Sequence, residues 1–187
     1  MSIHKVARMG HPVLRAKART VDKLEIKTQA VQDFIDSMID TMFEYSGVGL
    51  AAPQVHESIR VFVAMLDADG RGEGDATVFV NPEITMLGDQ TLEGWEGCLS
   101  IPEIRGRVPR AQHIRLSALD RNGKRFELDL KDFPARVVQH ETDHLDGVLF
   151  FDRMKELGSL TYLEEYSRYH ARRGKDDDED EDEDEDK

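Results

Sequence analysis

Residues 139–144 read QHETDH, a stretch that contains the pattern H-E-x-x-H. Positions four apart on a helix lie on one face, one turn from each other. In a helix, His140 and His144 would therefore direct their imidazoles toward one metal ion, and Glu141 would lie close enough to reach a water molecule bound there. Two ligands do not complete a catalytic metal site, so a third ligand must come from elsewhere in the chain.

Helix signals surround the metal pattern and recur near both ends of the chain. Asp132 and Pro134 are typical of a helix start, and Gly147 is typical of a helix end. Residues 27–45 place their apolar side chains on one stripe, which predicts an amphipathic helix. Residues 153–173 predict a last helix, despite a glycine within them. The metal pattern thus belongs to the second of three predicted helices.

The remaining patterns predict antiparallel strands. Residues 59–66 and 77–84 are rich in β-branched and aromatic residues, and an Asn-Pro pair closes the second run. Residues 113–119 and 124–130 alternate with period two around an Asn-Gly turn, which is a hairpin signal. Because helices and strands segregate rather than alternate, the predicted fold class is α+β, with mixed or antiparallel sheets and N- and C-terminal helices.

Size and composition favour a soluble, cytoplasmic protein. The chain has 187 residues, enough for one domain with a sizeable core. No apolar run approaches the roughly 18 residues of a membrane-spanning helix, and the N-terminus lacks the apolar segment of a signal peptide. The single cysteine, Cys98, excludes an internal disulfide and suits a reducing compartment.

The formal net charge of −13 comes from one end of the chain. Residues 176–186 hold 11 acidic residues and no basic residue, whereas the rest of the chain is close to neutral. Such a run repels itself and buries nothing, so residues 174–187 are predicted to be a disordered acidic tail. Residues 1–173 are then predicted to form a single catalytic metallohydrolase domain. The tail argues against nucleic-acid binding by this end, because phosphate contacts need cations.

Three kinds of third ligand are candidates to complete the metal pattern. One protease class has a histidine three residues beyond the glycine, but that position is Phe150, which cannot bind a metal ion. A second class uses a glutamate on a following helix, and Glu164 and Glu165 qualify. Cys98 is the third candidate, because a thiolate with two imidazoles is a known catalytic ligand set. Its setting, in a strand-like segment directly after a glycine, favours the cysteine.

Several charged residues near these ligands have two interpretations each. Arg136 stands at a helix position where an apolar residue is expected, and its stem could line a pocket while its head reaches water. Glu96 could form an ion pair with an arginine at 105, 107 or 110 that supports the cysteine segment, or all of these charges could be exposed.

Four stretches resemble those of peptide deformylases. They are RMGHPVLR at 8–15, GVGLAAPQV at 47–55, EGCLS at 96–100 and QHETDHLDG at 139–147. They occur in the order and at separations similar to those of the family, over roughly residues 5–153. The resemblance implies a mixed sheet around a central helix that carries the metal motif, in agreement with the α+β class.

The resemblance implies removal of the formyl group from N-formylmethionine at the start of nascent chains, with release of formate. Cys98, His140 and His144 would bind the metal ion, typically Fe²⁺, for which Zn²⁺ or another divalent ion can substitute. Glu141 would take a proton from water and pass it to the leaving nitrogen. A thiolate ligand makes the site less positive, so such a base is more necessary.

The resemblance also assigns residues to the substrate. The Gln54 side chain and the Leu99 backbone N–H would stabilise the oxyanion. Val48 and Gly49 would line the cleft, where their backbone groups would pair with the extended peptide like an added strand. Val137, beside the metal motif, is a candidate wall of the methionine pocket.

Two other functions compete with this one. The first is a zinc peptidase that uses His140, His144 and a glutamate of the following helix, and the second is a binding module in which the metal only stabilises the fold. For the deformylase, the expected partners are N-formylmethionyl nascent chains, with a transient ribosome contact. A basic patch for that contact would come from Arg168, Arg172, Arg173 and Lys175. No membrane contact and no direct recognition of nucleic acid are expected.

Overall fold

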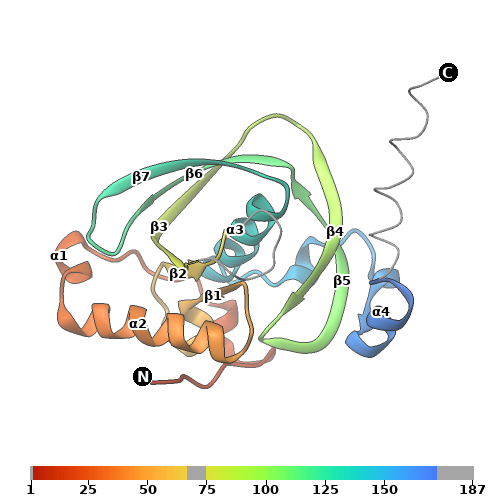
Figure 1. Cartoon of the computed structure of the whole chain (residues 1–187), viewed down its shortest axis with the longest axis horizontal. Helices are drawn as coiled ribbons and strands as arrows, with labels where there is room; N and C mark the ends of the chain where they lie inside the picture. The colour runs from red at the N-terminus through yellow and green to blue at the C-terminus, as the bar shows by residue number, and fades with distance from the viewer. Residues whose placement is uncertain (1, 67–74, 172–187) are drawn as a thin grey trace.

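The computed structural model describes residues 2–66 and 75–171 (Figure 1). Within these residues, the strands form two sheets, with the orders β1-β2-β3-β6-β7 and β4-β5-β8. All pairs of neighbouring strands are antiparallel. The larger sheet consists of β1 (Gly49–Ala51), β2 (Val61–Ala64), β3 (Thr77–Met86), β6 (His113–Leu119) and β7 (Arg125–Lys131). The smaller sheet consists of β4 (Thr91–Cys98), β5 (Ile101–Ala111) and β8 (Thr161–Tyr162).

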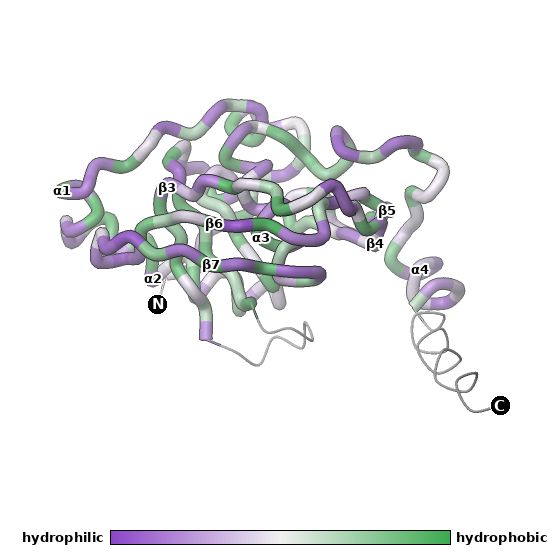
Figure 2. The backbone as a smooth tube through the Cα atoms, turned by 90° about the horizontal axis from the view of Figure 1, so that it is seen from above, coloured by the Kyte–Doolittle hydropathy of each residue, from purple (hydrophilic) through white to green (hydrophobic). Residues whose placement is uncertain are grey.

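The α-helices include a short α1 (Lys23–Ile26), α2 (Gln29–Glu44), α3 (Asp132–Leu145) and α4 (Leu163–Tyr169). Helix α3 contacts β1, β2, β6 and β7 of the larger sheet and β5 of the smaller one. Figures 1 and 2 show it in the middle of the molecule, with α2 along one side and α4 beyond the β4–β5 hairpin. The helix that carries H-E-x-x-H is thus the central helix, and the predicted α+β class is confirmed.

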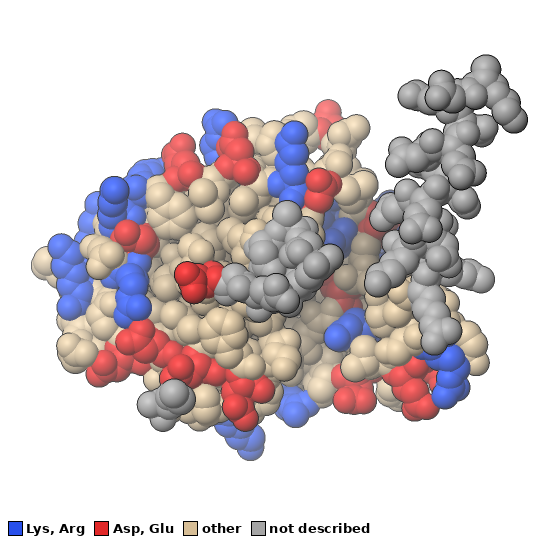
Figure 3. Space-filling view, in the orientation of Figure 1, with Lys and Arg blue, Asp and Glu red and all other residues tan. Residues whose placement is uncertain are grey.

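The core forms on both sides of the larger sheet. Helix α2 buries Ile35, Met38 and Met42 in a cluster that includes Val61 and Val63 of β2. Helix α3 packs in a second cluster with Phe62 and Phe79, whose rings stack with centroids 4.5 Å apart. Because side chains alternate along a strand, β2 supplies both clusters with successive residues. The outer face of α2 is acidic, and acidic side chains line this edge of the molecule in Figure 3.

Most predicted elements are confirmed, with small shifts of their ends. The amphipathic helix, the strand β2, the β6–β7 hairpin and the metal helix all form. The predicted helix end is confirmed as well, because Gly147 has a φ of 73°, in the left-handed region that glycine tolerates. The segment after α2 contains β1 and a 3₁₀ turn, Ala52–Val55.

The prediction that an Asn-Pro pair closes the strand at 77–84 is wrong. Strand β3 continues through Asn81 and Pro82, and its register with β6 shifts between Val80 and Glu83. Asn81 has a φ of 50°, and its side-chain amide both accepts from the Val21 N–H (2.9 Å) and donates to the Val21 carbonyl (2.8 Å). A β-bulge therefore accommodates Pro82 within the strand. The Asn81 amide provides hydrogen-bond partners for the backbone N–H and carbonyl of Val21.

The prediction of a long last helix over residues 153–173 is also wrong. Only α4 is α-helical within the described part of this segment, and two 3₁₀ turns (Phe150–Arg153 and Leu157–Ser159) and β8 precede it. Strand β8 pairs with β5, and Met154 packs against Gly106 of β5. These long-range contacts override the local helical preference. The predicted tail, residues 174–187, lies outside the described residues.

No helix within the described ranges has both the length and the apolar character needed to cross a membrane.

Replacing Asn81 by alanine should destabilise the protein by about 2 kcal/mol. The change removes both hydrogen bonds to Val21 and puts a residue that disfavours positive φ at the bulge. Urea unfolding followed by circular dichroism measures the loss. Asn122→Ala is the matched control, because Asn122 is exposed in the β6–β7 turn, and it should stay within about 0.5 kcal/mol of the wild type. Equal stability of the two variants would contradict this account of the bulge.

Candidate metal centre

Cys98 at the end of β4 and His140 and His144 on α3 converge on one point. One donor atom from each residue lies within 4.8 Å of the others, and all three residues are buried. The Cys98 Sγ and His144 Nε2 atoms are 3.2 Å apart. Among the described residues, no other group of three potential ligands comes together in this way. The arrangement brings the cysteine, rather than a downstream glutamate, to the two histidines.

The competing glutamates lie elsewhere. Glu164 and Glu165 are on α4, where both carboxylates pair with Arg168 of the same helix, at 3.0 and 3.3 Å. Neither belongs to the group of converging ligand atoms. The arrangement that a peptidase with a downstream glutamate ligand needs is therefore absent from residues 2–66 and 75–171.

The charges around Cys98 suit a thiolate ligand. Burial raises the pKa of the Cys98 thiol, but the imidazoles of His144 and His140 outweigh it and hold this pKa well below its usual value. Burial likewise lowers the pKa of His140, but Cys98 and Glu96 hold it well above its usual value. One thiolate and two imidazoles in a buried cluster form a donor set that suits Zn²⁺ or Fe²⁺. The residues therefore fit a divalent metal ion.

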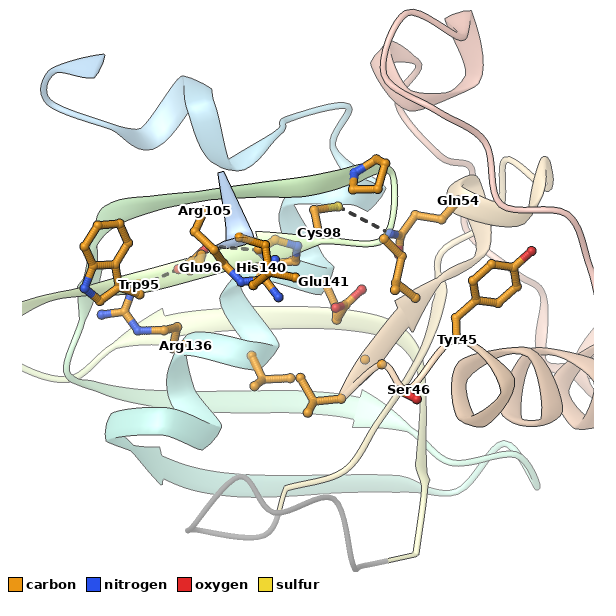
Figure 4. A pocket seen from close by; sticks show the side chains of 18 of the residues that line it. Tyr45, Ser46, Gln54, Trp95, Glu96, Cys98, Arg105, Arg136, His140 and Glu141 are labelled. Carbon is orange, nitrogen blue, oxygen red and sulfur yellow. Dashed lines mark hydrogen bonds and ion pairs between the residues drawn. The ribbon is translucent and has the colours of Figure 1, made fainter. Parts of the chain in front are cut away.

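Glu96 fixes the orientation of His140. Its Oε2 atom lies 2.9 Å from His140 Nδ1, so Nε2 is the ring nitrogen left for a metal ion. Arg110 donates to both carboxylate oxygens, at 2.9 Å each, and Arg136 donates to Oε1, also at 2.9 Å. Burial raises the pKa of Glu96, but the hydrogen bonds from Arg110 and His140 outweigh it, and the pKa lies far below its usual value. The Glu96 side chain is thus charged, and both of its carboxylate oxygens have hydrogen-bond partners (Figure 4).

These contacts decide between the two interpretations of the charged residues. Of the three arginines on β5, Arg110 alone pairs with Glu96 among the described residues, whereas Arg107 pairs with Glu93 at 3.2 Å. The expectation that the Arg136 head reaches water is wrong, because its guanidinium is held by Glu96 and by backbone carbonyls of β4 and β5.

A cavity of about 480 Å³ opens beside the converging ligands. Eight of the nine residues predicted for the site line it; these are Val48, Gly49, Gln54, Cys98, Leu99, Val137, His140 and Glu141. His144 lies behind them, 1% exposed. Strands β1 and β4 are edge strands of their sheets, and both contribute residues to the lining.

Glu141 is buried, and its carboxylate lies against the backbone of Gly49. A Cβ atom at Gly49 would be 2.5 Å from Glu141 Oε1, so this close approach requires glycine. Burial raises the pKa of Glu141 to about 7. Its Oε2 atom has no hydrogen-bond partner within the described part of the chain. A buried carboxylate without a hydrogen-bond partner, beside a group of potential metal ligands, is typical of a catalytic group.

Gln54 is 1% exposed and is not a solvated loop residue. Its Oε1 atom accepts a hydrogen bond from the Ala51 N–H at 2.8 Å. This contact orients the amide, so that Nε2 faces Cys98 Sγ at 3.5 Å and Ser100 Oγ at 3.3 Å (Figure 4). An amide N–H donor is therefore held beside the candidate metal ligand.

Other lining residues were not predicted as site residues. They include Tyr45, Trp95, Arg105, Phe133 and Leu163. Trp95 holds α4 against the cavity, since its ring packs on Tyr166 and His170 with centroids 5.1 and 5.0 Å away. These residues come from separate segments and carry no common motif, so only the fold identifies them.

The family model for polypeptide deformylases matches residues 3–159. The chain belongs to this family. It is 42% identical over 165 residues to peptide deformylase 2 of a Nostoc species, an alignment that covers 86% of this chain and 91% of the relative. It is 41% identical over 167 residues to peptide deformylase 1 of Bordetella pertussis, covering 87% of this chain and 93% of the relative.

Solved structures of the family agree with this fold. A class I type b peptide deformylase from Acinetobacter baumannii, solved with Met-Ala-Ser bound, has a TM-score of 0.76 and 40% identity. The match covers 82% of this chain and all of that one. The chain is thus a metal-dependent hydrolase that removes formyl groups from polypeptides, and the peptidase alternative is not supported.

Replacing Cys98 by serine should abolish metal retention. The variant loses the thiolate of the converging group and keeps only two imidazoles. Metal content per chain after purification, measured by mass spectrometry, should fall to below about a tenth of the wild-type value. Glu164→Gln and Glu165→Gln should retain metal like the wild type. Metal loss from either glutamine variant, with retention by the serine variant, would reverse the assignment.

Replacing Gly49 by alanine should lower kcat/KM about a hundredfold while metal content stays unchanged. The added methyl group displaces the Glu141 carboxylate, and small misplacements of a catalytic group have effects of this size. Formate release from a formylated peptide measures the change. Gly158→Ala is the control, since a Cβ there meets nothing within 4 Å. Wild-type rates for Gly49→Ala would show that Glu141 does not depend on this contact.

Proposed function

We propose that the enzyme removes the formyl group of N-formylmethionine from nascent chains, with Cys98, His140 and His144 as ligands of Fe²⁺. Zn²⁺ or another divalent ion can take the same position. The observation that carries the proposal is the convergence of these three ligands on one point, beside a cavity that Glu141 lines. Bound there, such an ion supplies a Lewis acid that polarises the formyl oxygen and lowers the pKa of water.

Glu141 acts as the general base and then as the general acid. It accepts a proton from water as the water oxygen attacks the formyl carbon. It then gives this proton to the amide nitrogen as the carbon–nitrogen bond breaks, which leaves formate and a free amino terminus. Its pKa of about 7 supports both steps near neutral pH. The negative charge of the Cys98 thiolate makes the site less positive, so a strong dependence on this base is expected.

Two donors stabilise the oxyanion that forms during attack. They are the Gln54 side-chain amide and the Leu99 backbone N–H. The hydrogen bond from the Ala51 N–H to Gln54 Oε1 supports this role, because it turns Nε2 toward Cys98 Sγ at the candidate metal centre. Such preorganised donors have large effects on hydrolysis, because they do not have to reorient as charge develops.

The peptide binds in an extended conformation along Val48 and Gly49. The edge strands β1 and β4 both contribute residues to the cavity lining, and an edge strand can extend its ladder with a peptide backbone. The methionine side chain enters the apolar part of the cavity beside Val137, which is 5% exposed, and Phe133. The complex of the Acinetobacter baumannii relative with Met-Ala-Ser supports peptide binding in this family.

The same proposal locates the enzyme in the cytoplasm, in transient contact with ribosomes. Arg168 is engaged by Glu164 and Glu165 of its own helix, so the contact would depend on Arg172, Arg173 and Lys175, outside the described residues. The acidic tail that follows them argues against any direct recognition of nucleic acid.

Formate release from a formyl-Met peptide tests the function. The enzyme, loaded with Fe²⁺ under anaerobic conditions, should release one formate per peptide, and the acetyl-Met peptide should react far more slowly. No formate release by the metal-loaded enzyme would refute the proposal.

In the same assay, Glu141→Gln should lower kcat about a thousandfold, because the amide cannot accept the proton of water. Metal content and the urea midpoint should remain at wild-type values. Glu83→Gln, which changes an exposed glutamate on β3, is the matched control and should retain full activity. Substantial turnover by Glu141→Gln would transfer the role of base to another group.

A further inference from the structure

Arg136 lies on α3 one turn before His140 and on the same face of the helix. Its side chain is 12% exposed and crosses from α3 to the smaller sheet. There it donates to the same carboxylate, Glu96, that binds His140. Arg136 is therefore a fixed part of the cavity wall next to the metal centre (Figure 4).

The charged end of Arg136 is held by the strands. Nη1 donates to the Val108 carbonyl at 2.7 Å as well as to Glu96, and Nη2 donates to the Leu92 carbonyl at 2.7 Å. Both terminal nitrogens are thus engaged by β4 and β5. A guanidinium held in this way can contribute its carbon stem and flat face to an apolar pocket without leaving its charge unpaired.

Gly94 makes room for this guanidinium. A Cβ atom at Gly94 would lie 2.8 Å from Arg136 Nη2 and 2.9 Å from Cζ. The arginine therefore fills the space in which β4 would otherwise present a side chain. Its position is restricted by this contact on one side and by its carbonyl partners at the tip.

A second cavity, of about 290 Å³, lies on the other side of Arg136. Three residues line both cavities: Trp95, Phe133 and Arg136. The second cavity is otherwise bordered by residues such as Leu92 and Ala111, which do not line the metal cavity. The side chains of these three residues thus separate the metal cavity from the second cavity.

We propose that Arg136 determines how long a first side chain the enzyme accepts, by closing the inner end of the methionine pocket against the second cavity. This inference rests on the proposed position of the methionine beside Val137. Without the arginine side chain, the two cavities would join and the pocket would lengthen. Each methylene group that then becomes buried should increase the affinity for the peptide roughly fourfold.

Two peptides that differ only in the first side chain test the proposal. One begins with formyl-Met and the other with formyl-S-butyl-homocysteine, which is longer by three methylene groups. For Arg136→Ala, the ratio of kcat/KM for the long peptide to that for the formyl-Met peptide should rise about tenfold or more over the wild-type ratio. Arg136→Leu, which retains a shorter apolar side chain, should change the ratio in the same direction but less.

The fold should tolerate these variants, because Arg110 still donates two hydrogen bonds to Glu96. Arg136→Leu decides the question if Arg136→Ala does not fold. Arg115→Ala is the control, since Arg115 pairs with Asp129 on the exposed side of β6 and β7 and lines neither cavity. Its ratio should equal that of the wild type.

Binding of the deformylated products separates this inference from the proposed function. Kd values of Met-Ala-Ser and its S-butyl-homocysteine analogue, measured by calorimetry, need no turnover. If the wild type released no formate, the proposed function would fail, and the ratio of Kd values would still decide the role of Arg136. The inference would be overturned if both Arg136 variants retained metal and their ratios of Kd values stayed within twofold of the wild-type ratio. An equal loss of affinity for both peptides would overturn it as well.

Discussion

The Glu96 carboxylate joins the two halves of the proposed metal centre. Cys98 comes from β4 and the two histidines come from α3, and these elements belong to different layers of the molecule. Glu96 is two residues before Cys98, so both side chains point toward α3, and both are buried. Its carboxylate binds His140 Nδ1 on α3 and Arg110 on β5. The residue that orients one ligand is therefore carried by the strand that supplies another.

Burying these charges is costly unless each one is paired, and an apolar core of the same volume is often more stable. Within the described residues, Glu96 and Asp143 are paired by Arg110, Arg136 and Arg153. What the charges contribute is geometry: a hydrogen bond to Nδ1 of His140 leaves Nε2 as the only ring nitrogen that can bind an ion. Asp143 adds a further charged contact between this network and α3, so α3 cannot rotate without breaking several charged contacts.

The sequence was most informative where the relevant spacing is local. The four-residue spacing of His140 and His144 and the apolar stripe of α2 follow from helical periodicity, and both helices form as predicted. Cys98 is some forty residues away, and its place beside them depends on the resemblance and on context rather than on spacing. Predictions failed where distant segments compete with local preference. Asn81 lies in a bulge, where its amide hydrogen-bonds to the backbone of Val21. Residues 153–162 do not form a helix, because β8 within them pairs with β5. Cavity residues such as Trp95 and Leu163 carry no local signal at all.

Three glycines near the site share a role that their local sequences do not reveal. Gly49, Gly94 and Gly97 all lack the positive φ that would require glycine for backbone reasons. Each one instead faces a charged side chain: Glu141 lies against Gly49, Arg136 against Gly94 and Arg105 against Gly97. In the described structure, a missing side chain on an edge strand thus leaves room for a charged group from a neighbouring element. These close contacts restrict where the Glu141 carboxylate and the guanidinium groups of the cavity wall can lie. Gly49 of the GVGLAA motif and Gly97 of the EGCLS motif are therefore best explained by the charged side chains that they admit.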